Sequence, residues 1–371
     1  MKKLKPSDAV MKYLEEKVEV HQLPNGSRLP TAAYIAEELG ISEGTVKNVF
    51  RRLAKEGKIR MRAGDGSFWM GEPDASQVVY HFGINTDHLA KPQGLGVWMH
   101  RIFGGLLHRK LLSGTAVQFH ICGDIFSKEA KLPEKLDGMF LLSLGTNTSD
   151  VFRHNGADIP CVALNPWFDD AAKNFVAPDY FAVSRRLGEI WRKSGRKKVL
   201  AILSPALPES VSVRLRYGGL LCGLEVGSGN EVECRYLTTP TGAEKCGYDG
   251  MKKMLRDGCW VPDAVYAVGD LLAFGAIQAL EEHGVRVPED ASVVGGNGAH
   301  FVKYPKRFLS TTAHPLEEIG EELFRLLMLR VEQKGADVPA SILASKLIAG
   351  GTTRPEENEW IIQGEEKVKN A

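Results

Sequence analysis

A segment near the amino terminus combines cations with hydrogen-bonding side chains at close spacing. These residues are Thr45, Lys47, Asn48, Arg51, Arg52, Arg60 and Arg62. Ammonium and guanidinium groups neutralise phosphates, and threonine or asparagine side chains can reach base edges or phosphate oxygens. The segment therefore predicts contact with double-stranded DNA. The alternative is a protein-contact domain with solvated charges, and cations on two successive elements favour DNA.

Three helices and a hairpin are expected to position these side chains. The expected elements are a first helix that Ser7 caps and that carries Val10, Tyr13, Leu14 and Val18, a second helix over 31–39 that ends at Gly40, a third from Ser42 to about Glu56, and strands over 58–62 and 67–70. Two helices joined by a tight glycine turn and followed by a basic hairpin predict a winged helix-turn-helix over residues 1–70. A break in the pattern at 71–77 predicts a linker.

This head resembles the GntR-type bacterial regulators. The motifs are Gly26-Ser-Arg-Leu-Pro-Thr, Ile35-Ala-Glu-Glu-Leu-Gly-Ile-Ser42, Thr45-Val-Lys-Asn-Val, Leu53-Ala-Lys-Glu-Gly-Lys-Ile and Gly64-Asp-Gly-Ser-Phe. The resemblance implies DNA contacts from Arg28, Thr31, Ser42, Glu43, Thr45, Lys47, Asn48, Arg51, Arg52, Arg62 and Gly66. Two positions depart from the family pattern, because Ala33 and Glu43 stand where the family usually has arginine. A carboxylate at position 43 repels phosphates but can accept from a cytosine amino group, so a non-standard operator is expected.

The rest of the chain alternates short apolar strands with amphipathic helices. The expected strands are 78–85, 116–121, 139–144, 161–164, 199–203, 233–236, 264–268 and 292–294, and the expected helices include 97–112, 180–193, 212–224, 247–256 and 271–283. This pattern predicts an α/β domain of two doubly wound lobes with parallel sheets over 78–354, followed by a tail at 355–371. Ligands bind such sheets at the carboxyl ends of the strands, here between the lobes.

The second half of this domain resembles the effector domain of LacI/GalR-type regulators, which is similar to periplasmic sugar-binding proteins. The motifs are Asp263-Ala-Val-Tyr-Ala-Val-Gly-Asp270, Gly284-Val-Arg-Val-Pro-Glu-Asp-Ala-Ser-Val-Val-Gly295, Leu309-Ser-Thr-Thr312, Pro315-Leu-Glu-Glu-Ile-Gly320 and Ser212-Val-Arg-Leu-Arg216-Tyr-Gly-Gly219. A GntR head joined to such a body is the architecture of arabinose-type repressors.

The resemblance implies ligand contacts from Trp98, Asn165, Trp167, Arg216, Asp270 and Asn297. An arginine fork grips vicinal oxygens, and aromatic rings stack on the apolar face of a sugar. Each residue also has a structural explanation: an ion pair for the arginine, a turn for Asn165, helix capping for Asp270 and core packing for the tryptophans. Asn297 stands where the family has aspartate, so the expected ligand is a sugar or a partly anionic derivative, or the pocket has lost its ligand.

Composition excludes several other classes of protein. The 371 residues contain 47 basic and 46 acidic side chains, which excludes a polybasic or acidic disordered chain. Residues 1–70 hold 13 basic against 9 acidic residues, and the remainder holds 34 against 37, so the weak positive charge lies in the head. Six scattered cysteines and the lack of an apolar run of about 20 residues or a signal-peptide core indicate a reducing cytoplasm.

The sequence gives little support for a metal site or a catalytic site. His81, His88, His100 and His108 are close in sequence, but a helix separates the last two by about 12 Å, so no metal site and no cofactor are expected. The sequence contains no nucleophile elbow, P-loop or His-Glu-x-x-His motif, so we expect no enzyme.

The sequence therefore predicts a cytoplasmic, homodimeric, ligand-responsive regulator that represses carbohydrate-related genes and binds a palindromic operator. The alternative is a solute-binding sensor module whose head contacts protein, or binds DNA without ligand control.

Overall fold

The computed structural model of the chain divides into two compact units, Met1–Val79 and Tyr80–Ala371, and each is described by itself. The structure describes residues 5–21, 27–62, 66–70, 78–85, 96–122, 132–142, 159–165, 173–204, 210–229, 231–256, 260–298 and 308–369. The predicted linker at 71–77 lies outside these residues.

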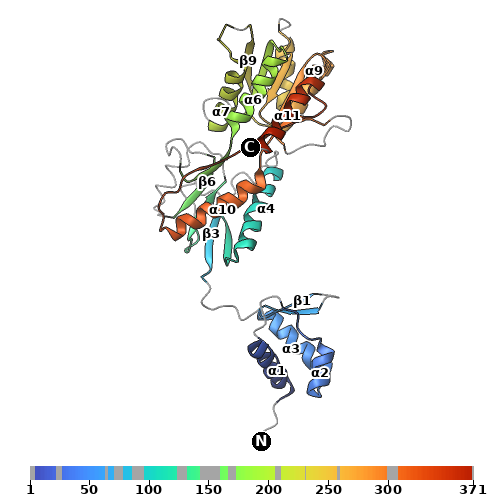
Figure 1. Ribbon diagram of the computed structural model, residues 1–371, viewed down its shortest axis with the longest axis vertical. Coiled ribbons are helices and arrows are strands. Elements are labelled where there is room, and N and C mark those ends of the chain that lie inside the picture. The colour runs from blue at the N-terminus through green and yellow to red at the C-terminus, as the bar shows by residue number, and fades with distance from the viewer. Residues whose placement is uncertain are drawn as a thin grey trace. The chain divides into compact units, whose positions relative to one another are not determined.

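The first unit is a winged helix-turn-helix, as predicted (Figure 1). Its elements are α1 (Pro6–His21), α2 (Ala32–Leu39), α3 (Glu43–Lys55), β1 (Ile59–Arg62) and β2 (Gly66–Trp69). One core joins the three helices to the hairpin, and it includes Val10, Ile35, Val46, Phe50, Leu53, Ile59 and Trp69. Gly40 ends α2 in the left-handed conformation, with φ of 65°, and turns the chain toward α3.

The start of α1 differs from the prediction. The helix begins at Pro6, so Ser7 is its second residue and not the residue before it. Proline is favoured at the first helical position because its missing N–H has no partner there in any case. The Ser7 hydroxyl donates instead to the Asp8 carboxylate at 3.2 Å.

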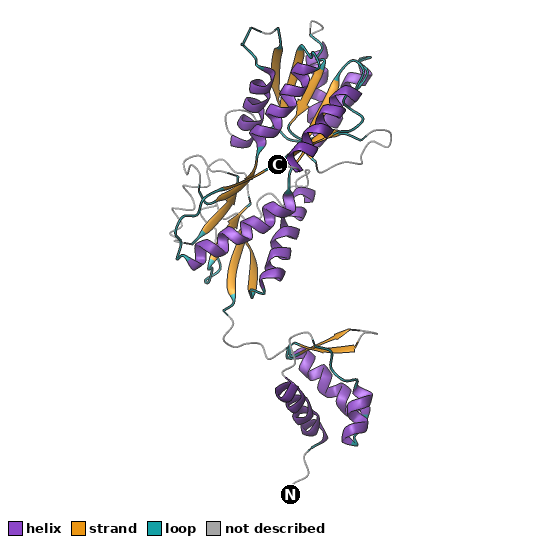
Figure 2. Ribbon diagram, viewed as in Figure 1, coloured by secondary structure: helices purple, strands orange, loops and turns teal. Residues whose placement is uncertain are grey.

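The second unit consists of two lobes, each with a six-stranded and mainly parallel sheet (Figures 1 and 2). The amino-terminal lobe has the order β13-β7-β6-β5-β3-β4, from β3 (Tyr80–Asn85), β4 (Val117–Cys122), β5 (Gly138–Leu141), β6 (Cys161–Leu164), β7 (Phe175–Pro178) and β13 (Ser341–Leu343). The carboxyl-terminal lobe has the order β14-β12-β11-β10-β8-β9, from β8 (Lys198–Leu203), β9 (Glu233–Thr238), β10 (Ala264–Ala267), β11 (Ser292–Asn297), β12 (Ser310–Ala313) and β14 (Lys346–Ile348). Only the β12–β14 pair is antiparallel among the pairings within these two sheets of described residues.

Helices pack in pairs against these sheets. In the amino-terminal lobe α4 (Gly96–Ser113) lies along α10 (Leu316–Glu332), as Figure 2 shows. In the carboxyl-terminal lobe α6 (Tyr180–Lys193) pairs with α7 (Val211–Leu224), and α8 (Glu244–Arg256) pairs with α9 (Asp270–Glu282). The two-lobed α/β prediction is confirmed, and β7, β12 and α10 are elements that the expected list lacked.

Three segments carry the chain from one lobe to the other. They follow β7, where α6 begins, follow β12, where α10 begins, and connect β13 to β14. Because all three join the same two bodies, any rotation of one lobe against the other must be absorbed within them.

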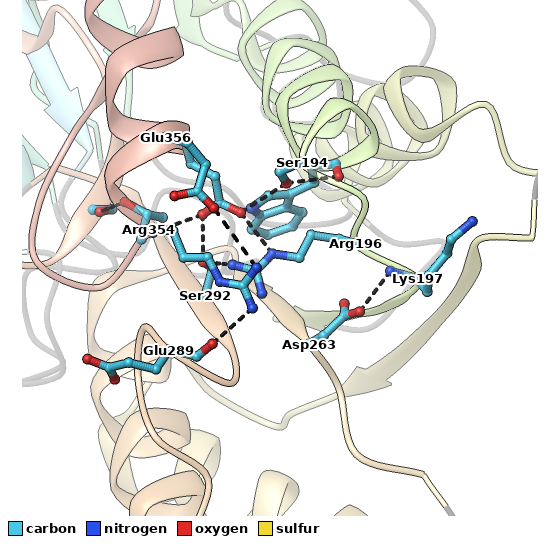
Figure 3. Close-up of polar contacts among 12 residues, drawn as sticks. Ser194, Arg196, Lys197, Asp263, Glu289, Ser292, Arg354 and Glu356 are labelled. Atoms are coloured by element: carbon cyan, nitrogen blue, oxygen red, sulfur yellow. Dashed lines mark hydrogen bonds and ion pairs between the residues drawn. The ribbon is translucent and has the colours of Figure 1, made fainter.

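The residues expected as a tail form a helix, α11 (Pro355–Lys369). Its first turn is fixed by a buried ion pair, in which Arg196 Nε lies 2.8 Å from Glu357 Oε1. Ser292 Oγ donates to the other carboxylate oxygen of Glu357 at 2.6 Å, and Ser194 Oγ donates to Oε1 at 3.0 Å (Figure 3). The helix therefore belongs to the carboxyl-terminal lobe, because burying this carboxylate without its partners is costly. None of the described helices has the length and apolar character needed to cross a membrane.

Candidate functional sites

Capping interactions orient the helix-turn-helix of the head. Thr31 Oγ1 accepts from the Tyr34 N–H at 3.2 Å, and Ser42 Oγ accepts from the Thr45 N–H at 3.2 Å. The hydroxyl oxygens of Ser42 and Thr45 also lie 2.9 Å apart. Thr31 and Ser42, both predicted DNA contacts, thus also have a structural role as caps. Thr31 fixes where α2 begins, and Ser42 fixes where α3 begins and which side chains of its first turn face outward.

The exposed face of α3 is basic but partly compensated. Val46, Val49, Phe50 and Leu53 turn inward. On the outer face Lys47 pairs with Glu43 at 2.9 Å, and Arg52 lies 3.8 Å from Glu56. Arg51 donates to the Asn48 side-chain oxygen at 2.8 Å.

These i,i+4 pairs are half-exposed, so each is weak and readily exchanged for a phosphate. Within α3 itself, Lys47, Arg51, Arg52 and Lys55 stand against the single carboxylate of Glu43. The helix therefore retains a positive outer face of the kind that meets a phosphate backbone.

The wing brings Arg28 to the residues that close the hairpin. Arg28 forms a β-bridge with Phe68, so a segment before α2 lines the hairpin. Gly66 has φ of 110°, and a Cβ there would lie 3.1 Å from Arg28 Nε. Arg62 stacks over the Phe68 ring, with 5.3 Å between Cζ and the ring centroid. Two predicted cations, Arg28 and Arg62, are thus positioned beside Gly66, where the positive φ and the close Arg28 side chain favour glycine.

In the second unit, Arg216 of α7 is the centre of a buried polar cluster. Its Nη1 donates to the Val268 carbonyl at 2.6 Å, and its Nη2 donates to Asn297 Oδ1 at 3.1 Å. Its Cζ lies 4.4 Å from the centroid of the Tyr180 ring. No carboxylate among the described residues pairs with Arg216, so the ion-pair explanation is not supported for that part of the chain.

His314 extends the cluster and has a defined tautomer. Arg216 Nη2 lies 3.0 Å from His314 Nε2, and His314 Nδ1 lies 2.8 Å from Ser345 Oγ. A guanidinium has only donors, so Nε2 must accept and Nδ1 must carry the ring proton. Burial, together with the charge of Arg216, holds the pKa of His314 well below its ordinary value of 6.5, so the ring is neutral.

The cluster touches all three segments that connect the lobes. Tyr180 follows β7, His314 follows β12, and Ser345 lies between β13 and β14. The Tyr180 and His314 rings are 5.1 Å apart and meet edge to face. One arginine side chain is thus linked by direct or second contacts to every connection between the lobes.

Two predicted ligand residues join the cluster from the amino-terminal lobe. Tyr180 Oη donates to Asn165 Oδ1 at 3.0 Å, and the Trp98 ring lies 6.2 Å from the His314 ring. Trp98 and Asn165 are both buried. The predicted contact Trp167 lies outside the described residues.

Asn165, directly after β6, and Asn297, the last residue of β11, have positive φ values of 70° and 120°. Asparagine tolerates this region better than most residues, and strained conformations gather at functional sites. The turn explanation for Asn165 is therefore compatible with the structure, and it does not exclude a ligand role.

Asp270 lies apart from the Arg216 contacts. Residue 269 caps α9 without a side-chain hydrogen bond, and Asp270 is the first residue of the helix. Its Oδ1 accepts from Thr311 Oγ1 at 2.7 Å. The capping explanation for Asp270 is wrong in its detail, because the carboxylate joins α9 to β12 instead of closing the helix end.

The sequence analysis missed Tyr180, His314 and Ser345. Each stands within two residues of a strand end, where parallel sheets place ligand contacts, but none of the three strands concerned, β7, β12 and β13, was expected. In the described part of the chain, no group of three or more His, Cys, Asp or Glu side chains is arranged to hold a metal ion.

Comparison with known proteins divides the chain in the same way. Residues 6–68 match the bacterial regulatory proteins of the gntR family, and residues 203–353 match a periplasmic binding protein-like domain. The HTH-type transcriptional repressor PurR of Edwardsiella ictaluri is 32% identical over 203 residues, which cover 53% of this chain and 56% of that repressor. The repressor of the same name from Erwinia tasmaniensis is 34% identical over 113 residues, 29% of this chain and 33% of its own. The chain thus spans about half or less of the length of these curated relatives.

Solved structures of LacI-type regulators share the fold. The lac repressor dimer bound to operator and the anti-inducer ONPF has a TM-score of 0.61 at 19% identity, and the match covers 75% of this chain and 96% of that one. A LacI family regulator from Enterococcus faecalis with bound ribose has a TM-score of 0.59 at 18% identity, covering 74% and 99%. The chain therefore combines a GntR-type helix-turn-helix domain with a periplasmic-binding-protein-like domain that is similar in sequence to PurR repressors and similar in fold to the lac repressor and other LacI family regulators.

Proposed function

We propose that this chain is a ligand-responsive transcriptional repressor that binds operator DNA as a homodimer in the cytoplasm. The observation that carries the proposal is the Arg216 cluster, which lies at the carboxyl ends of the strands and touches every connection between the lobes, in a chain with a basic winged helix-turn-helix. The effector is a sugar-like small molecule, and the regulated genes concern carbohydrates. The role is binding and not catalysis.

The mechanism is a shift between two arrangements of the lobes. A ligand that binds Arg216 must compete with its contacts to Asn297 and His314, and those contacts lead to the lobe connections. Such a ligand changes the balance of lobe arrangements only by its differential affinity for them. In a dimer, that change alters the spacing of the two heads and hence the fit to two half-sites.

DNA capture tests the first half of this proposal. The purified chain is incubated with genomic fragments at about 50 and 200 mM salt, and bound fragments are sequenced. Discrete palindromic sites that survive the higher salt are expected. Arg51→Ala should weaken binding to those sites and reduce the salt slope by about 1, because one phosphate contact is lost. Lys12→Ala is the matched control, because Lys12 is an exposed cation on α1 that likewise contacts a side chain of its own helix, Glu16.

Binding that is diffuse, or unchanged in Arg51→Ala, would favour the sensor module whose head contacts protein. The compensation of Lys47 by Glu43 is the observation that keeps this second candidate open. For the effector half, Arg216→Ala should abolish any ligand-induced rise in melting temperature. A full rise in that variant would remove Arg216 from the effector site.

A further inference from the structure

The two buried arginines of the described residues differ in whether a carboxylate pairs with them. Two arginines are buried among the described residues, Arg196 and Arg216. The Arg196 side chain is 2% exposed and faces a Glu357 carboxylate that is 0% exposed, 2.8 Å away (Figure 3). Arg216 is 6% exposed, and no carboxylate oxygen of the described residues lies within 4.0 Å of its nitrogens. A buried guanidinium without a counter-ion is costly, and among the described residues the positive charge of Arg216 is uncompensated.

The partners that Arg216 does have are neutral. Val268 offers a backbone carbonyl, Asn297 an amide oxygen and His314 a neutral ring nitrogen. Protonation of His314 is opposed by burial and by Arg216 itself, which hold its pKa well below 6.5. The buried carboxylate of Asp270 accepts from Thr311 and forms no ion pair with Arg216.

Hydrogen-bond donors are also in surplus. The Asn165 amide oxygen is used by Tyr180, and the Asn297 oxygen and His314 Nε2 are used by Arg216. The buried N–H groups Arg216 Nε, Asn165 Nδ2 and Trp98 Nε1 have no hydrogen-bond partner among the described residues. All three side chains are more than nine-tenths buried and belong to one connected cluster. A site with spare donors and a spare positive charge favours a ligand that supplies acceptors and negative charge.

From this surplus we propose that the effector is an anionic, hydroxylated small molecule whose oxyanion pairs with Arg216. This inference rests on the proposed function, because it assigns the chemical class of that effector. A neutral sugar supplies no counter-ion for Arg216, whereas a carboxylate or a phosphate does. An oxyanion accepts from Nε and an Nη group of Arg216 together, which supplies the missing counter-ion, and its hydroxyl oxygens accept from Asn165 and Trp98.

The first test needs no ligand. Asn297→Asp replaces the amide that Arg216 contacts at 3.1 Å with a carboxylate of the same shape, and aspartate tolerates the positive φ of this position as asparagine does. The melting temperature of the ligand-free full chain should rise by about 3 °C or more, because a buried ion pair forms. The matched control is Asn165→Asp, another buried strand-end asparagine with positive φ, whose oxygen faces Tyr180 and not Arg216. This control should melt at a lower temperature than the wild type.

The second test compares ligand charge directly. Glucose, glucuronate and glucose 6-phosphate are titrated into the full chain by calorimetry, and the two anions distinguish a carboxylate from a phosphate source. At least one anion should bind about 10-fold or more tightly than glucose, and this preference should disappear in Arg216→Gln and in Asn297→Asp. Arg214→Gln, an exposed arginine on the same helix, should keep it.

Two results would overturn the inference. One is a melting temperature of Asn297→Asp that is equal to or lower than that of the wild type. This result would mean that the charge of Arg216 is already compensated in the ligand-free chain. The other is glucose binding at least as tightly as both anions. Where none of the three compounds binds, Asn297→Asp decides alone. Operator capture by the wild-type chain is independent of both results, so a regulator with a neutral effector is distinguishable from a chain that does not regulate.

Discussion

At the scale of single residues, His314 is the titratable group with the most defined surroundings. Its ring is fully buried, accepts from Arg216 and donates to Ser345. The folded state keeps it neutral, because burial first and the Arg216 charge second lower its pKa well below 6.5. In the unfolded state the ring takes up a proton near its ordinary pKa. Below that pH the unfolded state therefore binds more protons than the folded state.

The contribution of His314 to the free energy of unfolding therefore decreases as the pH falls. The contribution of His314 is fully present above about pH 6.5 and is lost as the pH falls toward the folded-state pKa, with a slope of at most about 1.4 kcal/mol per pH unit. His314→Gln keeps an acceptor for Arg216 but cannot titrate, so its free energy of unfolding should depend less on pH between 7 and 5. Urea unfolding at several pH values measures both slopes. Equal slopes for His314→Gln and wild type would show that the ring is not kept neutral.

At the scale of elements, the attachment of α11 depends on one buried carboxylate. Glu357→Gln leaves Arg196 buried without its counter-ion, and breaking a buried pair in this way costs about 3–5 kcal/mol. The carboxyl-terminal lobe should therefore lose that much unfolding free energy in urea. Glu356→Gln is the control, because its half-exposed carboxylate lies 4.0 Å from Arg354 and such surface pairs contribute about 0–1 kcal/mol. Equal stabilities for the two variants would mean that α11 is held by its apolar contacts alone.

Elements with strong periodicity were predictable, and the site was predictable only in part. The helix over 180–193 and the strand over 161–164 match the structure residue for residue. The strand β12 was not predicted because Ser310-Thr-Thr-Ala313 has no apolar run, and β7 was not predicted because it ends in Pro178, which is unfavourable in a strand. Without these strands, the sequence did not point to Tyr180 or His314 as site residues. Contacts such as Arg216 to His314 join residues 98 positions apart, so they depend on how strands are ordered in the sheets and not on local spacing.

At the scale of the whole molecule, the chain separates the winged helix-turn-helix head, for which we propose DNA binding, from the two-lobed unit, for which we propose ligand binding. The head, Met1–Val79, has its own core under α3 and the wing, so it should fold as an isolated fragment. In the proposed dimer two heads meet one palindrome, and the second head then binds at a high effective concentration. The isolated fragment meets each half-site as a separate molecule and lacks this advantage.

The proposed dimer and the isolated head should therefore differ in their affinity for a palindromic site. On a palindromic site found by genomic capture, the full chain should bind about 10²- to 10⁴-fold more tightly than fragment 1–79, because linking two binding modules gives avidity of this size. On a single half-site the two proteins should bind with similar affinity, since only one head is engaged in each case. Fluorescence anisotropy with both duplexes measures the four affinities, and sedimentation of the full chain gives its oligomeric state. A full chain that sediments as a monomer and binds both duplexes equally would contradict the dimeric repressor, because ligand-driven respacing of the heads requires two of them on one operator.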